Sequence, residues 1–199
     1  MALLNSSASG LRRGATAPRR AAWVLSMVLL VATCQGTAAE APISAENQVK
    51  AVFLFNFAQF LGWPSQAFKG AQAPIVIGVL GADPFGTYLD ELVQGERIGD
   101  RPMVVRRFNR VEDAADCNIL FISRSEAGNL GRIVAGLKGR SVLTVGDMEG
   151  FTRQGGMVRF TTEDGKIHLR INVQAAQSVG LSISSRLLAH AALVSPGED

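Results

Sequence analysis

Side chains that could do chemistry are few in this sequence of 199 residues, which contains two histidines and two cysteines. His168 falls in a predicted strand and His190 in a predicted helix, and neither stands at metal-ligand spacing from another histidine or a cysteine. The sequence has no G-x-S-x-G, H-E-x-x-H or C-x-x-C motif. These patterns predict a protein that holds no metal ion or cofactor and is not an enzyme.

The most suggestive local pattern is the stretch of residues 78–86, where a buried strand runs through a glycine turn into a helix N-terminus. Backbone N–H groups at such a turn can hold an anion, although Asp83 would repel a phosphate. The alternative is a capped tight turn with no ligand. Because ligands of parallel α/β sheets bind beyond the carboxyl ends of the strands, a small-molecule pocket here would comprise Gly81, Asp83, Phe85 and Ser123.

Apolar runs predict the strands that would carry these turns. Three buried strands are expected over residues 75–80, 118–122 and 141–145, and a fourth over 103–108. Helices are expected from Asp83 to about Gln94 and from Ser125 to about Leu137. The alternation indicates an α/β fold: a single domain with a mixed, largely parallel sheet, flanked by helices on both faces.

The two ends of the domain complete this prediction. A helix is expected from Ser44 to Leu61, and residues 157–161 and 166–171 flank an Asp-Gly pair that predicts a hairpin, followed by a helix over 173–191. Cys117 lies beside an apolar strand and is expected to be a buried, inert thiol. Apolar residues of the first helix recur at three- and four-residue steps, namely Val49, Val52, Phe53, Phe57 and Phe60.

Residues 1–39 have the pattern of a cleavable secretory signal peptide. Basic residues that end at Arg20 precede the apolar residues 21–32, and small residues at 37–39 form a cleavage site. A lipid anchor through Cys34 is the less favoured alternative, because Thr33 is unusual in a lipobox. We therefore expect a periplasmic protein whose folded domain comprises residues 40–199.

The net charge of +3 belongs to this leader. Four of the 20 basic residues lie within residues 1–39, whereas all 17 acidic residues lie after them. Residues 40–199 therefore carry 16 basic against 17 acidic residues, a net charge of −1. A nucleic-acid-binding function loses its main support.

Several short motifs resemble, in order and spacing, those of the YfiR family of exported bacterial proteins along nearly all of residues 40–199. Some relatives carry a cysteine pair near the Gly155-Gly156 segment, and this sequence has no cysteine there, so redox control through such a bridge is not expected. The matching motifs are Val49–Phe57, Trp63-Pro64, Gly81–Gly86, Leu120–Ser123, Val142–Val145, Phe151, Gly155–Val158, Ile171–Val173, Gly180-Leu181 and Ile183–Ser185.

The resemblance implies a periplasmic negative regulator that catalyses nothing. A YfiR-like protein binds the periplasmic region of an inner-membrane diguanylate cyclase and represses cyclic di-GMP synthesis. An OmpA-like outer-membrane lipoprotein can sequester it, which releases the cyclase and favours biofilm formation. The alternative is a periplasmic small-molecule sensor that acts on another membrane receptor. A homodimer is also expected, because a Phe-rich helix and a hairpin edge offer self-complementary surfaces.

The resemblance places the partner surface near the Gly-Gly hairpin segment, which here supplies Phe151, Met157, Arg159 and His168. Alternate residues of a strand face opposite sides, so Met157 and Arg159 are expected to share one face. The alternative is an edge hairpin whose outer side is merely solvated.

Overall fold

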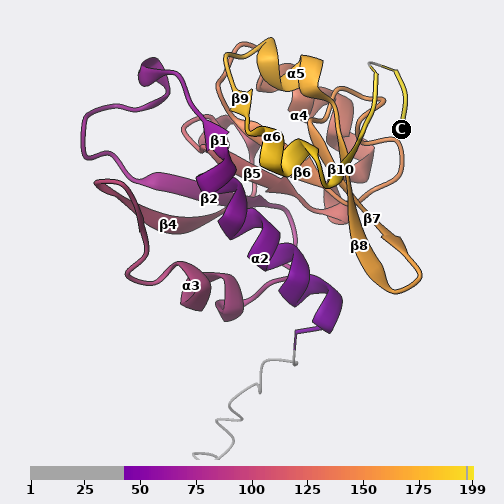
Figure 1. The fold of residues 1–199 in the computed structure, drawn as a ribbon, viewed down its shortest axis with the longest axis horizontal. Coiled ribbons are helices and arrows are strands. Elements are labelled where there is room, and N and C mark those ends of the chain that lie inside the picture. Colours follow the sequence, from indigo (N-terminus) through magenta and orange to yellow (C-terminus); the bar gives the residue numbers. More distant parts are fainter. Residues whose placement is uncertain (1–42, 196) are drawn as a thin grey trace, which may run out of the picture. The chain divides into compact units, whose positions relative to one another are not determined.

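A mixed sheet of eight strands organises the part of the chain that the structure describes, residues 43–195 and 197–199 of a computed structural model (Figure 1). The predicted leader lies outside these residues. The spatial order is β10-β8-β7-β6-β5-β2-β4-β3, and β4, β2, β5, β6 and β7 are mutually parallel. The strands are β2 (Ile75–Leu80), β3 (Arg97–Ile98), β4 (Arg101–Phe108), β5 (Ile119–Ile122), β6 (Leu143–Gly146), β7 (Val158–Glu163), β8 (Lys166–Ile171) and β10 (Ala191–Leu193).

Helices cover both faces of this sheet, as the sequence predicts. On one face lie α2 (Ala45–Phe60), α3 (Thr87–Val93), α5 (Val173–Gln177) and α6 (Ser185–Leu188). On the other lie η2 (Val111–Ala114) and α4 (Leu130–Gly136), preceded by η3 (Arg124–Asn129). The central strands are buried on both sides because their successive apolar side chains point alternately into the two cores.

The first helix begins and ends where the sequence predicts. The Ser44 side chain accepts a hydrogen bond from the Asn47 N–H at 3.2 Å, and the helix ends at Phe60, before the Gly62-Trp63-Pro64 segment. The buried face of this helix, however, is rotated about the helix axis relative to the predicted apolar stripe. Val49 and Val52 of that stripe are exposed. The face against the sheet comprises Lys50, Ala51, Leu54, Phe57 and Ala58, so it includes a charged residue.

The hairpin of β7 and β8 has the predicted turn. Asp164 and Gly165 form a two-residue loop between the paired residues Glu163 and Lys166, and both have positive φ, +50° and +72°. That conformation matches the twist of a two-residue hairpin. Figure 1 shows the hairpin projecting at the side of the sheet.

The predicted C-terminal helix over residues 173–191 is wrong. The chain forms α5, then β9 (Ser182–Ile183), which pairs with β1 (Leu61–Gly62), then α6 and the edge strand β10. Residues 178–185 contain four serines and a glycine, and serine side chains compete for the backbone hydrogen bonds of a helix. The Ser178 hydroxyl donates to the Ala175 carbonyl at 2.7 Å, and Gly180 has φ +78°, so α5 cannot continue.

Two other helices start later than predicted. Asp83 accepts a hydrogen bond from the Phe85 N–H at 2.7 Å and closes a turn, and α3 begins only after Gly86, at Thr87. The stretch expected to begin a helix at Ser125 is 3₁₀ up to Asn129. None of the helices in the described part of the chain is long and apolar enough to span a membrane.

Cys117 is buried in the core that α4 covers, and burial raises the pKa of its thiol to about 12. Because the thiolate is the reactive form, we predict that Cys117 in a Cys34→Ser background reacts with a maleimide at pH 8 only after denaturant is added. Mass spectrometry of the adduct in native buffer and in urea measures this. Rapid labelling in native buffer would contradict the buried position.

Candidate functional site

The candidate site lies at the carboxyl edge of the parallel strands. After β2 the chain continues into α3 on one face of the sheet, whereas after β5 it continues into α4 on the other face. The strand order therefore reverses between β2 and β5, and loops that leave a sheet in opposite directions open a crevice at such a point. The predicted pocket residues belong to these two loops.

Gly81 allows the two loops to touch. A Cβ atom on Gly81 would lie 2.4 Å from the Ser125 Oγ, and the Ala82 N–H donates a hydrogen bond to that same oxygen at 2.9 Å. The loop after β2 therefore packs directly against the loop after β5. The glycine serves this close approach and does not leave an open cradle for an anion.

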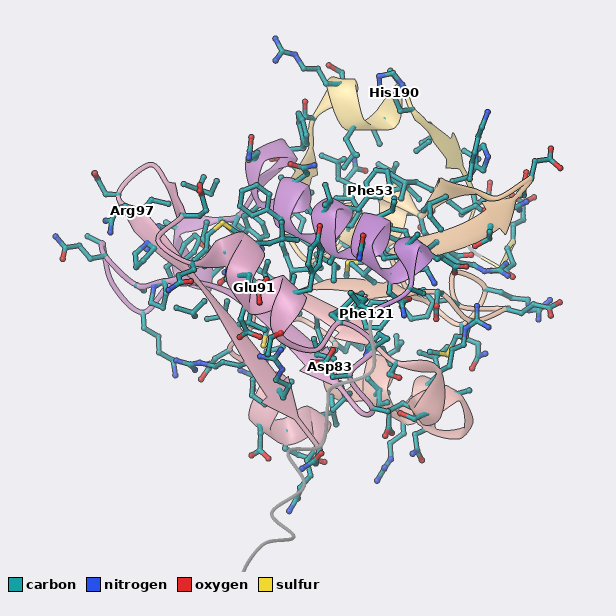
Figure 2. All side chains as sticks on the ribbon, turned by 90° about the horizontal axis from the view of Figure 1, so that it is seen from below. Phe53, Asp83, Glu91, Arg97, Phe121 and His190 are labelled. Atoms are coloured by element: carbon teal, nitrogen blue, oxygen red, sulfur yellow. The ribbon has the colours of Figure 1, made fainter. Side chains whose placement is uncertain are left out.

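Asp83 and Phe85 hold the turn after β2 together. The second Asp83 oxygen accepts a hydrogen bond from the Arg107 Nε at 2.9 Å, and Arg107 also pairs with Asp90. The hydrogen bonds to Asp90 and Asp83 raise the pKa of this guanidinium. The buried Phe85 ring packs edge-on against Phe121, with centroids 4.8 Å apart (Figure 2, where Asp83 and Phe121 are labelled).

A cavity of about 480 Å³ opens beside these loops, under the N-terminal half of α2. Of the four predicted pocket residues, Ser123 lines this cavity, whereas Gly81, Asp83 and Phe85 do not. Pro84, which stands between Asp83 and Phe85, lines the cavity instead. The lining comprises Ser44, Glu46, Asn47, Lys50, Pro84, Phe121, Ser123, Arg124, Asp147 and Thr162.

Lys50 is the central group of this cavity. Its Nζ lies 2.6 Å from a carboxylate oxygen of Asp147, which follows β6, and 2.6 Å from one of Glu46 on the same helix. Only 3% of the Lys50 side chain and 11% of the Asp147 side chain are exposed. The hydrogen bond from Lys50 holds the pKa of Glu46 below its usual value, although burial opposes this shift.

Arg124 closes the same cluster from the loop after β5. Its Nε donates to the other Asp147 oxygen at 3.0 Å, and its Nη2 donates to the Asp147 carbonyl at 3.0 Å. The positive charges of Lys50 and Arg124 are thus balanced by the carboxylates of Glu46 and Asp147 at one end of a polar cavity. Such a site suits a small polar molecule that exchanges hydrogen bonds with these groups. Among the residues that the structure describes, no three His, Cys, Asp or Glu side chains are grouped to hold a metal ion.

The four residues expected at the partner surface differ in how far they are buried. Phe151 is buried, with its ring against Gly156, where a Cβ would lie 2.2 Å from a ring carbon. Met157 is also buried and does not share an accessible face with Arg159. Phe151 presents no surface in this conformation, and Met157 reaches only the wall of a cavity beside α4 and α5. Arg159 is half-buried and His168 is exposed.

Arg159 and His168 belong to the outer face of the β7–β8 hairpin. The cross-strand pairs of this face are Arg159 with Arg170, Thr161 with His168, and Glu163 with Lys166. The opposite face packs under α2, where the Phe160 ring stacks on Phe57 at 6.1 Å between centroids. The outer face is therefore polar and accessible at its tip, while the inner face belongs to the core.

Sequence reasoning missed Lys50, Asp147 and Arg124. A signal was present for Lys50, because it stands four residues before Leu54 and seven before Phe57, on the stripe that turns out to be buried. A lysine on a buried stripe must be paired. No local pattern identifies Asp147 as its partner, because 97 residues separate the two.

Comparison with known proteins gives one match that covers most of the chain. The family model described as YfiR/HmsC-like matches residues 47–192. No curated protein matches the sequence. Solved structures that match include a conserved domain protein from Vibrio cholerae, with a TM-score of 0.49 and 13% identity over 74% of this chain and 59% of that one. Another is the ABC domain in complex with L-Trp from Streptococcus pneumoniae, with a TM-score of 0.44 and 12% identity over 60% of this chain and 54% of that one. The chain thus spans less than two thirds of either structure.

The position of Lys50 leads to a stability prediction. Lys50→Met keeps the aliphatic bulk but leaves Asp147 buried with one cation fewer, so we expect a loss of about 3 kcal/mol in the free energy of unfolding. Urea denaturation followed by circular dichroism measures the change.

The matched control is Lys69→Met. Lys69 pairs with Asp116 at the same 2.6 Å, but 79% and 56% of the two side chains are exposed. An exposed pair contributes less than about 1 kcal/mol. Equal losses for the two variants would contradict the role assigned to Lys50.

Proposed function

Because this chain belongs to the YfiR/HmsC-like family, we propose that it is a periplasmic negative regulator that binds the periplasmic region of an inner-membrane diguanylate cyclase and represses cyclic di-GMP synthesis. The observation that carries this proposal is the extent of the family match, which spans residues 47–192 and so includes every layer of the fold. On this view the protein is exported by its leader and acts by binding, without catalysis of its own.

The outer face of the β7–β8 hairpin is the contact surface we propose for the cyclase. Two of the four residues that the resemblance implies, Arg159 and His168, belong to this face. Thr161, Glu163 and Lys166 lie on it as well. The hairpin projects from the body of the sheet, so a partner can approach its tip (Figure 1). Phe151 and Met157 support this face from within, because both are buried near its base.

An OmpA-like outer-membrane lipoprotein that competes for the same protein, and a homodimer, belong to the same proposal. The exposed Val49 and Val52 on α2 favour a second protein contact away from the hairpin, because large apolar side chains are seldom exposed side by side. Two separate surfaces would allow a regulator to bind one partner and be withdrawn by another.

The test of the hairpin surface is a charge reversal at its exposed tip. We expect Lys166→Glu combined with His168→Glu to raise intracellular cyclic di-GMP to the level of a strain without the gene, because both side chains are exposed and their loss leaves the core intact. The melting temperature of the purified variant should stay within a few degrees of the unaltered protein.

The control is Lys138→Glu, an exposed charge reversal after α4 on a different face, which should repress normally. A double variant that folds and still represses fully would remove the hairpin from the contact surface. A strain without the gene whose cyclic di-GMP is unchanged would overturn the regulatory proposal itself.

The cavity around Lys50 favours a second candidate function, a small-molecule sensor that acts on a membrane receptor. Its position at the point where the strand order reverses is the usual place for ligands in such sheets. The two functions are compatible, because a ligand under α2 could alter the affinity for a protein partner.

A thermal-shift screen of small polar metabolites tests the sensor. A ligand of this cavity should raise the melting temperature, and Ser123→Ala should weaken the effect because Ser123 lines the cavity. Asp83→Ala is the control, since Asp83 stands outside the lining and should leave the shift unchanged once basal stability is subtracted. A flat screen would count against the sensor.

A further inference from the structure

Two arginines stand directly opposite each other on the outer face of the hairpin. Arg159 of β7 pairs in register with Arg170 of β8, and like charges at such positions destabilise a sheet unless an anion lies between them. A cavity of about 540 Å³ adjoins this pair. Its lining includes four arginines, Arg124, Arg153, Arg159 and Arg170, and four acids, Asp147, Glu149, Glu163 and Asp199.

Asp199 supplies the anion. Its carboxylate accepts hydrogen bonds from the Gly150 N–H at 2.6 Å and from the Thr152 hydroxyl at 2.8 Å, and it pairs with Arg159. The Arg170 Nη1 donates to the main-chain oxygen of Asp199 at 2.6 Å. Only 11% of the Asp199 side chain is exposed, and Thr152 is fully buried. The site therefore has the donors of a carboxylate-binding pocket.

The charge state of Asp199 agrees with this geometry. Burial opposes ionisation, but the hydrogen bonds from Gly150 and Thr152 and the charge of Arg159 hold the pKa of Asp199 below its usual value. The Arg159 Nε is buried and has no hydrogen-bond partner among the described residues. The site thus keeps one unused donor besides those that hold Asp199.

Few hydrogen bonds hold the described residues between β10 and Asp199. Leu193 and Glu198 are exposed. The Val194 N–H donates to the Ile171 carbonyl at 3.0 Å. Beyond it Ser195 and Glu198 bond to each other, and the Thr152 hydroxyl lies 3.1 Å from the Glu198 carbonyl oxygen. Asp199 is the residue of this strap, residues 194–199, with the most contacts to the site. A carboxylate held by polar contacts alone can be displaced by a competing ligand of the same chemistry.

We propose that Gly150, Thr152, Arg159 and Arg170 form a carboxylate-binding site that the chain's own Asp199 occupies, and that an acidic peptide from another protein binds there by displacing it. The strap then acts as a built-in competitor, so the apparent affinity for the peptide is reduced by the fraction of molecules in which Asp199 is bound. This inference concerns the chemistry of the site and holds whether or not the partner is a cyclase.

The test uses the full chain and a labelled, C-terminally amidated peptide with the sequence of residues 194–199. In fluorescence anisotropy we expect Asp199→Asn to bind this peptide about tenfold more tightly than the unaltered chain, because the internal competitor is gone. A peptide with Asn in place of the final Asp should not bind. Adding Arg159→Gln to Asp199→Asn should abolish binding, whereas adding Arg132→Gln, an exposed arginine of α4 outside this cavity, should not.

A second measurement, by NMR, follows the site directly and does not rely on the affinity for the peptide. The Gly150 amide resonance in NMR should move in Asp199→Asn, because the N–H loses its charged acceptor, and should return when the peptide is added. Equal peptide binding by the unaltered chain and Asp199→Asn would overturn the proposal. Equal binding of the Asp and Asn peptides, or a Gly150 resonance that does not respond, would do so as well.

Discussion

The ion pair between Lys50 and Asp147 fixes the position of α2 over the sheet, and the candidate cavity depends on it. A buried lysine is stable only when its charge is matched, and here the match comes from the loop after β6. The pair therefore joins the N-terminal half of α2 to the carboxyl edge of the sheet. Glu46, which shares the lysine, also accepts a hydrogen bond from Thr162 of β7 at 3.2 Å, so the same cluster ties the hairpin to the helix.

The middle of the fold could be predicted from local patterns because its strands are buried on both faces. The buried run Ile75–Leu80 has the expected bounds. The half-exposed strand Lys166–Ile171 also has them, because the Asp-Gly turn before it lies where its chemistry requires. The C-terminal third could not be predicted in the same way. There a helix-like periodicity competes with serine side chains and with the edges of two sheets, and tertiary pairing of β9 and β10 decides the outcome.

Of the four residues predicted for a small-molecule pocket, one lines the candidate cavity. Ser123 lines the cavity because loops after parallel strands gather at one edge, which is a property of topology. Gly81, Asp83 and Phe85 instead build the loop next to it, since their types serve close approach, capping and packing. Charged partners that are distant in sequence, such as Arg124 and Asp147, produce no periodic pattern in the sequence. Such pairs can be recognised only once the fold is known.

The contacts of α2 also constrain when the protein can fold. This helix is the first element described, yet its salt bridge reaches 97 residues along the chain and its bond to Thr162 reaches 116. Such non-local contacts form slowly, because a long loop must close before they contribute any free energy. The part of α2 that packs on the hairpin therefore remains uncovered until β7 and β8 are available, whereas α3 and β5 can pack against the helix earlier. A chain with this topology therefore completes the core beneath α2 only when its C-terminal half is present.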